Sequence, residues 1–323
     1  MPREAPAAEH LAFRVTRAEN GERLDRFLRK RIPWRSRTNL QALIATGLVR
    51  LNGAPARSAQ RVSPGDAVET PVRDPRALSR DCFDLPLPVL IDDPDFLVID
   101  KPPHLATHPT GSHLRRNAVS ALRARTGEPA PTPVHRLDLE TSGVLLFARN
   151  RQAHRALALQ FERREVRKIY LAVVVGRVGP EAGILDPPLG RHGGSRVSIR
   201  MRAGTPGGRV ARTDFRVLRR WPAFTLIELA PHTGRQHQIR AQLEAFGHPV
   251  VGDKIYGPDE RHFLDHLAGR LSEGARQRLL LDRHALHAAR LHFRHPRTGA
   301  PVDARAPLPG DLARFIEGLP DGA

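Results

Sequence analysis

The sequence of 323 residues contains a single cysteine, Cys82, and no apolar run long enough to cross a bilayer. One cysteine excludes an intrachain disulfide and a cysteine-rich zinc site. The first residues, MPREAPAAEHLAF, include no apolar segment typical of a secretory signal, and neither a P-loop nor a dinucleotide-binding fingerprint occurs. These absences favour a cytoplasmic protein with no membrane segment and no nucleotide cofactor.

Acidic residues are also scarce, with 34 Asp and Glu against 52 Lys and Arg, which gives a formal net charge of +18. Such an excess indicates a polyanionic partner, either nucleic acid or an anionic membrane surface. No cationic amphipathic helix stands apart from a domain, so nucleic acid is favoured. A hydrophobic content of 40% supports a folded core, and the length suits two domains.

Basic residues are concentrated near the N-terminus, where residues 22–61 hold ten Lys and Arg against two acids. Apolar residues at helical spacing predict two helices, over residues 22–32 and from Ser36 to Gly47, followed by short strands around the turn Asn52-Gly53. A charge run is usually a solvated helix face, but this one-sided density favours binding to a phosphate backbone. The candidate contacts are Arg23, Arg26, Lys30, Arg35 and Arg37.

The order of this segment, RLDRFL and then G-x-V-x-L-N-G, resembles an S4 RNA-binding domain over residues 13–72. A linker with proline follows at 73–85, and a larger domain is expected at 86–320. Short apolar runs alternate with few helices in the larger domain, which predicts an α+β fold. Its central stretch is His135-Arg136-Leu137-Asp138, followed by a Thr-Ser-Gly turn and a buried strand. The local pattern alone favours a turn-capping role for Asp138 over a catalytic one.

The stretch HRLDLETSGVLLFA and the preceding IDDPDFLVIDKPPHLATHP resemble the RluA-type RNA pseudouridine synthases. The resemblance implies a catalytic domain built on a mixed, mainly antiparallel sheet flanked by helices. It also implies that Asp138 is the catalytic nucleophile, with attack on the sugar or on the base as alternatives. Arg136 would occupy the space left by a flipped uridine, and His135 would support the motif.

Two further motifs follow in the order the family has them. Tyr170 lies in a predicted strand, where core packing is the commoner role, but K-x-Y-x-A resembles the family motif whose tyrosine lies over the target base and takes part in proton transfer. The segment TGRQHQIR predicts a helix that begins near Arg235, where the free amides of the helix N-terminus and the arginine favour an RNA contact. The resemblance of this segment implies that Arg240 pairs with Asp138 and keeps it ionised. The chain has Ala241-Gln242 where the family commonly has Val-His, which affects the hydrogen bonds around the site.

The sequence therefore predicts an RNA pseudouridine synthase that acts as a monomer and uses neither cofactor nor metal. The combination of an S4 module with this catalytic domain resembles the branch of the family that modifies ribosomal RNA. Large-subunit rRNA, free or in a pre-ribosomal particle, is therefore the expected substrate. The same chemistry on tRNA, and a non-catalytic S4-containing RNA-binding or ribosome-assembly protein, are the alternatives. The basic glycine-rich segment 190–212 is either a mobile loop or an RNA contact. Histidine pairs at 262/266 and 284/287 lack the further ligands of a zinc site.

Overall fold

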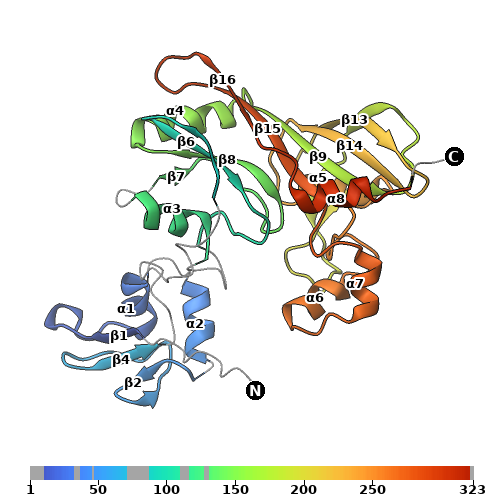
Figure 1. Cartoon of the computed structure of the whole chain (residues 1–323). Helices are drawn as coiled ribbons and strands as arrows, with labels where there is room; N and C mark the ends of the chain where they lie inside the picture. The colour runs from blue at the N-terminus through green and yellow to red at the C-terminus, as the bar shows by residue number, and fades with distance from the viewer. Residues whose placement is uncertain are drawn as a thin grey trace, which may run out of the picture.

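A computed structural model describes residues 11–32, 37–45, 47–70, 87–109, 116–126 and 131–320. The predicted linker at 73–85 and Arg35 lie outside these ranges. The described chain forms a small four-stranded sheet with two helices and a large sheet of ten strands (Figure 1). Among the described residues, no helix has both the length and the apolar character to cross a membrane.

The small sheet has the order β1-β4-β2-β3 and belongs to the N-terminal module. Helices α1 and α2 supply Leu24, Phe27, Leu28 and Leu40 to a core that the strands close with Val68. This confirms the predicted two helices and short strands. The elements are β1 (Leu11–Arg14), η1 (Arg17–Glu19), α1 (Leu24–Arg31), α2 (Arg37–Ala45), β2 (Arg50–Leu51), β3 (Ala54–Pro55) and β4 (Ala67–Thr70).

The large sheet has the order β10-β13-β14-β9-β15-β8-β6-β5, with β16 beside β15 and β7 beside β8. Every pairing is antiparallel except that of β15 with β8, so the predicted mixed, mainly antiparallel sheet is confirmed. The strands are β5 (Val89–Asp92), β6 (Phe96–Lys101), β7 (Thr132–Pro133), β8 (Ser142–Ala148), β9 (Arg167–Val175), β10 (Ala182–Leu185), β13 (Thr213–Arg220), β14 (Phe224–Pro231), β15 (Leu286–Arg294) and β16 (Pro301–Arg305).

Helices cover both faces of this sheet. They are α3 (Ala118–Thr126), α4 (Arg151–Glu162), α5 (Gln238–Ala245) and α8 (Gly310–Glu317). Helices α6 (Arg261–Leu267) and α7 (Glu273–Leu279) lie away from the sheet (Figure 1). Along β8, Leu145 and Phe147 pack in the same cluster as residues of α3, whereas Leu146 packs with Leu157 of α4. Both faces of β8 are therefore buried, and all seven of its residues are buried. This strand fixes the end of the central stretch.

The basic segment 190–212 contains a short hairpin of β11 (Leu189–Arg191) and β12 (Met201–Ala203), and turns and irregular structure make up most of the remainder. Arg200 bonds to Glu244 at 2.9 Å and to Glu260 at 2.6 Å, which ties the hairpin to α5 and to the start of α6. The backbone N–H of Met201 also donates to the hydroxyl of Tyr256 at 2.8 Å. An RNA contact by the remaining arginines stays a prediction.

Candidate active site

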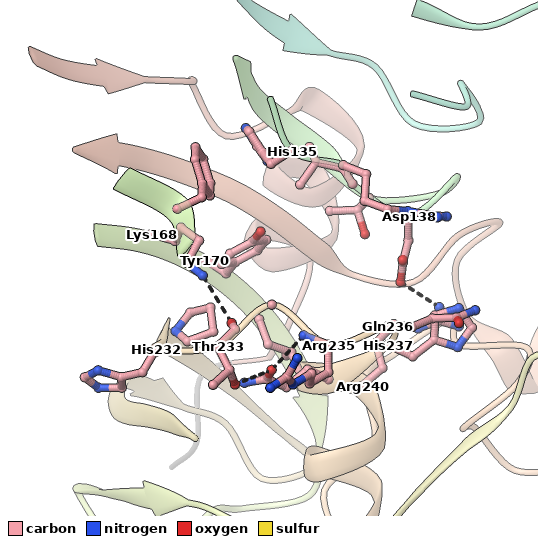
Figure 2. A pocket seen from close by; sticks show the side chains of 18 of the residues that line it. His135, Asp138, Lys168, Tyr170, His232, Thr233, Arg235, Gln236, His237 and Arg240 are labelled. Atoms are coloured by element: carbon pink, nitrogen blue, oxygen red, sulfur yellow. Dashed lines mark hydrogen bonds and ion pairs between the residues drawn. The ribbon is translucent and has the colours of Figure 1, made fainter. Parts of the chain in front are cut away.

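The three motifs meet at one cavity of about 580 Å³. Its walls come from the central stretch around residues 135–141, from α4 and β9 at 161–170, and from the segment 231–240 that leads into α5 (Figure 2). Such a cavity is large enough for a nucleotide-sized ligand. The polar side chains that point into it include Asp138, Lys168, Tyr170 and His237.

A row of paired residues across four adjacent strands brings two of these motifs together. Lys101 on β6 pairs with Gly143 on β8, Gly143 with Ala288 on β15, and Ala288 with Tyr170 on β9. Gly143 has φ +112°, and a Cβ there would lie 2.2 Å from the carbonyl oxygen of Ala288. Only glycine permits this approach. Tyr170 thus lies two strands, or about 10 Å, from the end of the Asp138 segment.

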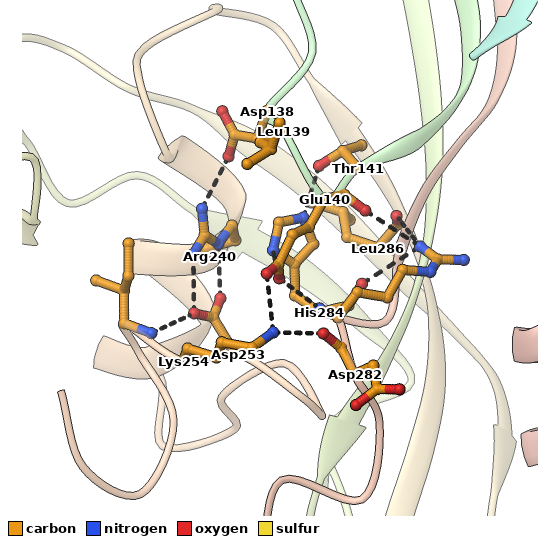
Figure 3. Close-up of polar contacts among 12 residues, drawn as sticks. Asp138, Leu139, Glu140, Thr141, Arg240, Asp253, Lys254, Asp282, His284 and Leu286 are labelled. Carbon is orange, nitrogen blue, oxygen red and sulfur yellow. Dashed lines mark hydrogen bonds and ion pairs between the residues drawn. The ribbon is translucent and has the colours of Figure 1, made fainter. Parts of the chain in front are cut away.

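Arg240 links Asp138 to a second carboxylate. Its Nη1 donates to Asp138 Oδ2 at 3.0 Å, while Nε and Nη2 donate to Asp253 at 2.6 and 2.8 Å (Figure 3). The Arg240 side chain is 5% exposed, Asp253 is fully buried, and Asp138 is 22% exposed. The pairing predicted for Arg240 and Asp138 is therefore present. Asp138 is the carboxylate of the two that a ligand in the cavity can reach.

The electrostatics keep Asp138 ionised. Burial alone raises its pKa, but the positive charges of His237 and Arg240 outweigh burial and lower the pKa to about 2. Burial lowers the pKa of His237 to about 4, so this imidazole is neutral at pH 7. Arg240 is therefore the stabilising cation at neutral pH. An ionised carboxylate at a cavity wall can act as a nucleophile or as a base.

Tyr170 and Lys168 form the wall that faces Asp138. Burial, together with the negative charge of Asp138, raises the pKa of the Tyr170 phenol well above its ordinary range. The phenol is therefore protonated at neutral pH and can donate a hydrogen bond. Lys168 Nζ donates to the carbonyl oxygen of Thr233 at 3.1 Å, and burial lowers its pKa to about 8.

The backbone of the Asp138 segment is held by residues to which the sequence motifs assign no role. Thr107 Oγ1 accepts from the N–H of Leu137 at 3.1 Å and donates to its carbonyl oxygen at 3.2 Å. The buried ammonium of Lys101 donates to three carbonyl oxygens, that of Leu139 among them at 3.3 Å. A fully buried lysine is rare without such partners, and burial lowers its pKa to about 7.

The opposite side of the segment is held by a buried ion pair. Lys254 Nζ donates to Glu140 Oε1 at 2.8 Å, and the other oxygen of Glu140 accepts from the backbone N–H of His284 at 3.1 Å (Figure 3). The hydroxyl of Thr141 lies 2.7 Å from His284 Nε2. Asp253 and Lys254 follow Gly252, which has φ +77° and at which a Cβ would lie 2.1 Å from the carbonyl oxygen of Arg283.

His135 and Arg136 differ in exposure. His135 Nε2 accepts from the backbone N–H of Leu146 at 3.1 Å, and its ring stacks on Phe161 with centroids 5.0 Å apart. Burial lowers the pKa of His135 to about 3, so its ring is neutral and can serve as this acceptor. Arg136 is exposed and lines the cavity. The first residue fastens the segment to β8, and the second is accessible to a ligand.

The helix expected to begin near Arg235 begins three residues later, at Gln238. The cause is local: the Gln238 side chain accepts from the backbone N–H of Arg235 at 3.0 Å and from Thr233 Oγ1 at 2.6 Å, which closes a turn before the helix. Arg235 Nε donates to the carbonyl oxygen of Val210 at 3.2 Å, beside the β11–β12 hairpin.

Gln242 stands where the family pattern commonly has histidine. It is buried, and both the nitrogen and the oxygen of its side-chain amide form hydrogen bonds. Its amide donates to the carbonyl oxygen of Leu185 at 2.9 Å and accepts from Thr213 Oγ1 at 2.7 Å. These bonds join α5 to β10 and β13. Gln242 is therefore a polar anchor under the helix that carries Arg240.

In the small module, a buried aspartate organises two of the predicted RNA contacts. Asp25 accepts from Arg23 at 3.1 Å and from Arg37 at 3.0 Å, and it also accepts from Gln41 at 2.8 Å. Lys30 pairs with Glu22 at 2.9 Å, and its side chain is 63% exposed. Arg26 is exposed on α1. The two guanidiniums keep partly exposed surfaces beside their structural ion pairs.

Histidines near the site bind hydroxyl groups. His284 contacts Thr141, and His287 Nδ1 lies 2.9 Å from Ser142 Oγ. Among the described residues, one group of three side chains has metal-ligand proximity, formed by Asp93, Asp95 and His295. Asp95 already pairs with Arg297 at 2.6 Å, and the group does not line the cavity.

Comparison with known proteins gives two family matches. Residues 95–245 match the model of RNA pseudouridylate synthase, and residues 22–68 match the S4 domain. An uncharacterized RNA pseudouridine synthase of Chloroflexus aurantiacus is 40% identical, with 98% of this chain and 96% of that protein covered. The ribosomal large subunit pseudouridine synthase D of Xanthomonas campestris is 38% identical, with 93% and 89% covered. The structure of human RNA pseudouridylate synthase domain containing 1 has a TM-score of 0.55 at 26% identity, covering 74% of this chain and 97% of that one.

Proposed function

This chain belongs to the RNA pseudouridylate synthase family, whose enzymes isomerise uridine in RNA to pseudouridine, and we propose that its substrate is large-subunit ribosomal RNA. The similarity to a protein named as a ribosomal large subunit synthase supports this substrate, and it extends over both the S4 module and the larger sheet. The excess of basic residues supplies the charge that RNA binding requires.

The observation that carries the chemistry is the ionised, reachable carboxylate of Asp138 beside the buried Arg240. In our proposal, Asp138 is the nucleophile and forms a transient bond to the sugar or the base of the uridine, which breaks again before the product leaves. The bond from ribose C1′ to N1 of uracil breaks, and the freed base turns within the cavity. A new bond then joins C1′ to C5, and the proton lost from C5 is balanced by one gained at N1. The reaction needs no oxidant, no water and no metal.

The base must leave its stack before it can enter the cavity. We assign to Arg136, which is exposed at the cavity, the role of filling the space that the uridine vacates. Tyr170 lies against the base, where its protonated phenol offers a hydrogen bond. His135 acts indirectly, by fastening the segment that carries both Arg136 and Asp138.

The S4 module binds the phosphate backbone in this proposal. Arg23, Arg26, Lys30 and Arg37 lie on or beside α1 and α2 and are exposed or partly exposed. Arg235 adds a contact close to the cavity. Such contacts release counterions, so binding weakens as salt rises.

The test is a map of pseudouridine in total RNA from cells that lack the protein. We expect one or more large-subunit sites to disappear, to return with the wild-type gene, and to stay absent with Asp138→Asn. If Asp138→Asn restored the missing pseudouridines, Asp138 would not be the nucleophile. Loss of sites in tRNA alone would refute the substrate, and loss of none would leave the RNA-binding alternative as the better account of the protein in the cell.

A further inference from the structure

His237 occupies a strained backbone conformation at the cavity wall. It precedes α5 with φ 54° and ψ 20°, in the left-handed region that residues other than glycine seldom adopt. Residues held in this way are strained and persist where the surrounding structure determines them. The conformation directs the His237 side chain to the cavity, beside the Asp138–Arg240 pair (Figure 2).

The hydrogen bonds of Tyr256 determine which nitrogen of His237 carries the proton. The Tyr256 hydroxyl accepts from the N–H of Met201 at 2.8 Å and lies 3.0 Å from His237 Nδ1. If Nδ1 carried the proton, the hydroxyl would accept twice and its own hydrogen would be buried without a partner, because Tyr256 is 1% exposed. The satisfied arrangement has the hydroxyl donating to Nδ1. The proton of the neutral ring therefore resides on Nε2.

The Nε2–H group of His237 has no hydrogen-bond partner within the part of the chain that the structure describes. The residue is 9% exposed, and it lines the same cavity as Asp138 and Tyr170. Because Nε2 is not among the fully buried atoms that lack a partner, it is accessible from the cavity, where a ligand can accept a hydrogen bond from it. Arg240 and Arg136 are the nearby cations and Asp138 and Asp253 the nearby anions that act on this ring.

We propose that His237 is a catalytic residue whose Nε2–H donates to a carbonyl oxygen of the flipped uracil and stabilises the negative charge that develops there. The inference rests on the proposed function. When the C1′–N1 bond breaks, its electron pair stays with the uracil, and the charge spreads onto the carbonyl oxygens. His237 keeps its proton throughout and acts as a fixed dipole. Its burial keeps the ring neutral near pH 7, so it neither competes with Arg240 for Asp138 nor adds a second cation.

The deciding variant is His237→Gly, because glycine adopts the left-handed conformation without strain and so removes the imidazole with little effect on the fold. Removing one preorganised donor typically lowers a rate constant by about 10² to 10³. We expect a loss of this size in single-turnover pseudouridine formation, with RNA affinity changed less than about twofold and with partial recovery when imidazole is added. Tyr256→Phe removes the hydroxyl that keeps the His237 proton on Nε2, and it should give a smaller loss of rate. His248→Ala, at the far end of α5, is the matched control and should react like wild type.

Three results would overturn this role. One is a His237→Gly variant within about threefold of the wild-type rate. Another is a joint loss of affinity and rate that imidazole does not repair, which would indicate a structural role. The third is a His248→Ala loss equal to that of His237→Gly. Wild-type protein that is inactive on large-subunit rRNA would instead overturn the proposed substrate. The two proteins would then be compared on total RNA, and a His237→Gly variant as active there as wild type would overturn the role of His237.

Discussion

Asp253 binds the Arg240 guanidinium through two nitrogens, at 2.6 and 2.8 Å, and leaves the third to reach Asp138 at 3.0 Å. Asp253 is in turn held by the backbone N–H groups of Ile255 and Tyr256 at 2.9 and 3.0 Å. The position of the Asp138 carboxylate, which we propose as the nucleophile, thus depends on a turn that follows α5. Asp253 acts through Arg240 and is a positioning residue.

The first prediction concerns Asp253→Asn. It leaves Arg240 with one charged partner in a buried site, where breaking a pair costs about 3–5 kcal/mol. We expect a loss of this order in the free energy of unfolding measured with urea, and a lower rate of pseudouridine formation at saturating RNA. Asp303→Asn is the control, since Asp303 pairs with Arg290 and Arg305 at the surface, where loss of a pair costs less than about 1 kcal/mol. Equal stability of the two variants would contradict the prediction.

Gly143→Ala tests the strand row that brings Tyr170 near Asp138. The new Cβ would meet the Ala288 carbonyl oxygen at 2.2 Å, at a φ of +112° that side chains disfavour. Strain and overpacking together should lower the free energy of unfolding by at least about 2 kcal/mol. Gly193→Ala is the matched control, because a Cβ there meets no atom within 4 Å. A Gly143→Ala protein with wild-type urea midpoint and activity would show that β8 and β15 can separate without consequence.

Buried neutral histidines predict a loss of stability in mild acid. Burial lowers the pKa of His237 and His287 to about 4 and that of His284 to about 3, below the value of about 6.5 expected in the unfolded chain. The unfolded state therefore binds more protons as pH falls below 6.5. Stability is full above that pH and declines toward pH 4, by about 1.4 kcal/mol per pH unit for each histidine.

The measurement is the urea midpoint between pH 7 and pH 5, a range in which ordinary carboxylates remain ionised in both states. His287→Gln removes one of these groups and should make the slope shallower by about 1.4 kcal/mol per pH unit. A flat wild-type profile, or an unchanged slope in the variant, would show that these rings take up protons in the folded protein.

Much of this site could be predicted from the sequence because the candidate residues lie in short contiguous motifs. The resemblance paired Asp138 with Arg240, which are 102 positions apart, and the structure contains that pair. Helical spacing likewise predicted both helices of the small module, and an unbroken apolar run predicted the buried strand β8. The local pattern is sufficient there, since it reports how much of one element is buried.

The supporting residues were not found because their partners are distant in the sequence. Thr107 meets Leu137 only through the packing of β6 against β8, and Lys254 meets Glu140 across 114 positions. Neither contact leaves a periodic signal. Gln242 was noticed in the sequence because it departs from the family pattern, which suggested altered hydrogen bonding. Its partners, Leu185 and Thr213, are identified only in the folded chain.

The last prediction concerns RNA binding by the small module. Arg26 is exposed on α1 and forms no ion pair with an acid among the described residues, so Arg26→Ala should remove about one phosphate contact. We expect the slope of log affinity against log salt to fall by about one, with the single-turnover rate at saturating RNA unchanged. Arg14→Ala is the control, because Arg14 is exposed on β1, on the sheet rather than on the helix. If both variants lower the slope equally, the contact is spread over the module, and if neither does, RNA binds through the cavity domain alone. Either result would contradict a phosphate-binding face formed by α1.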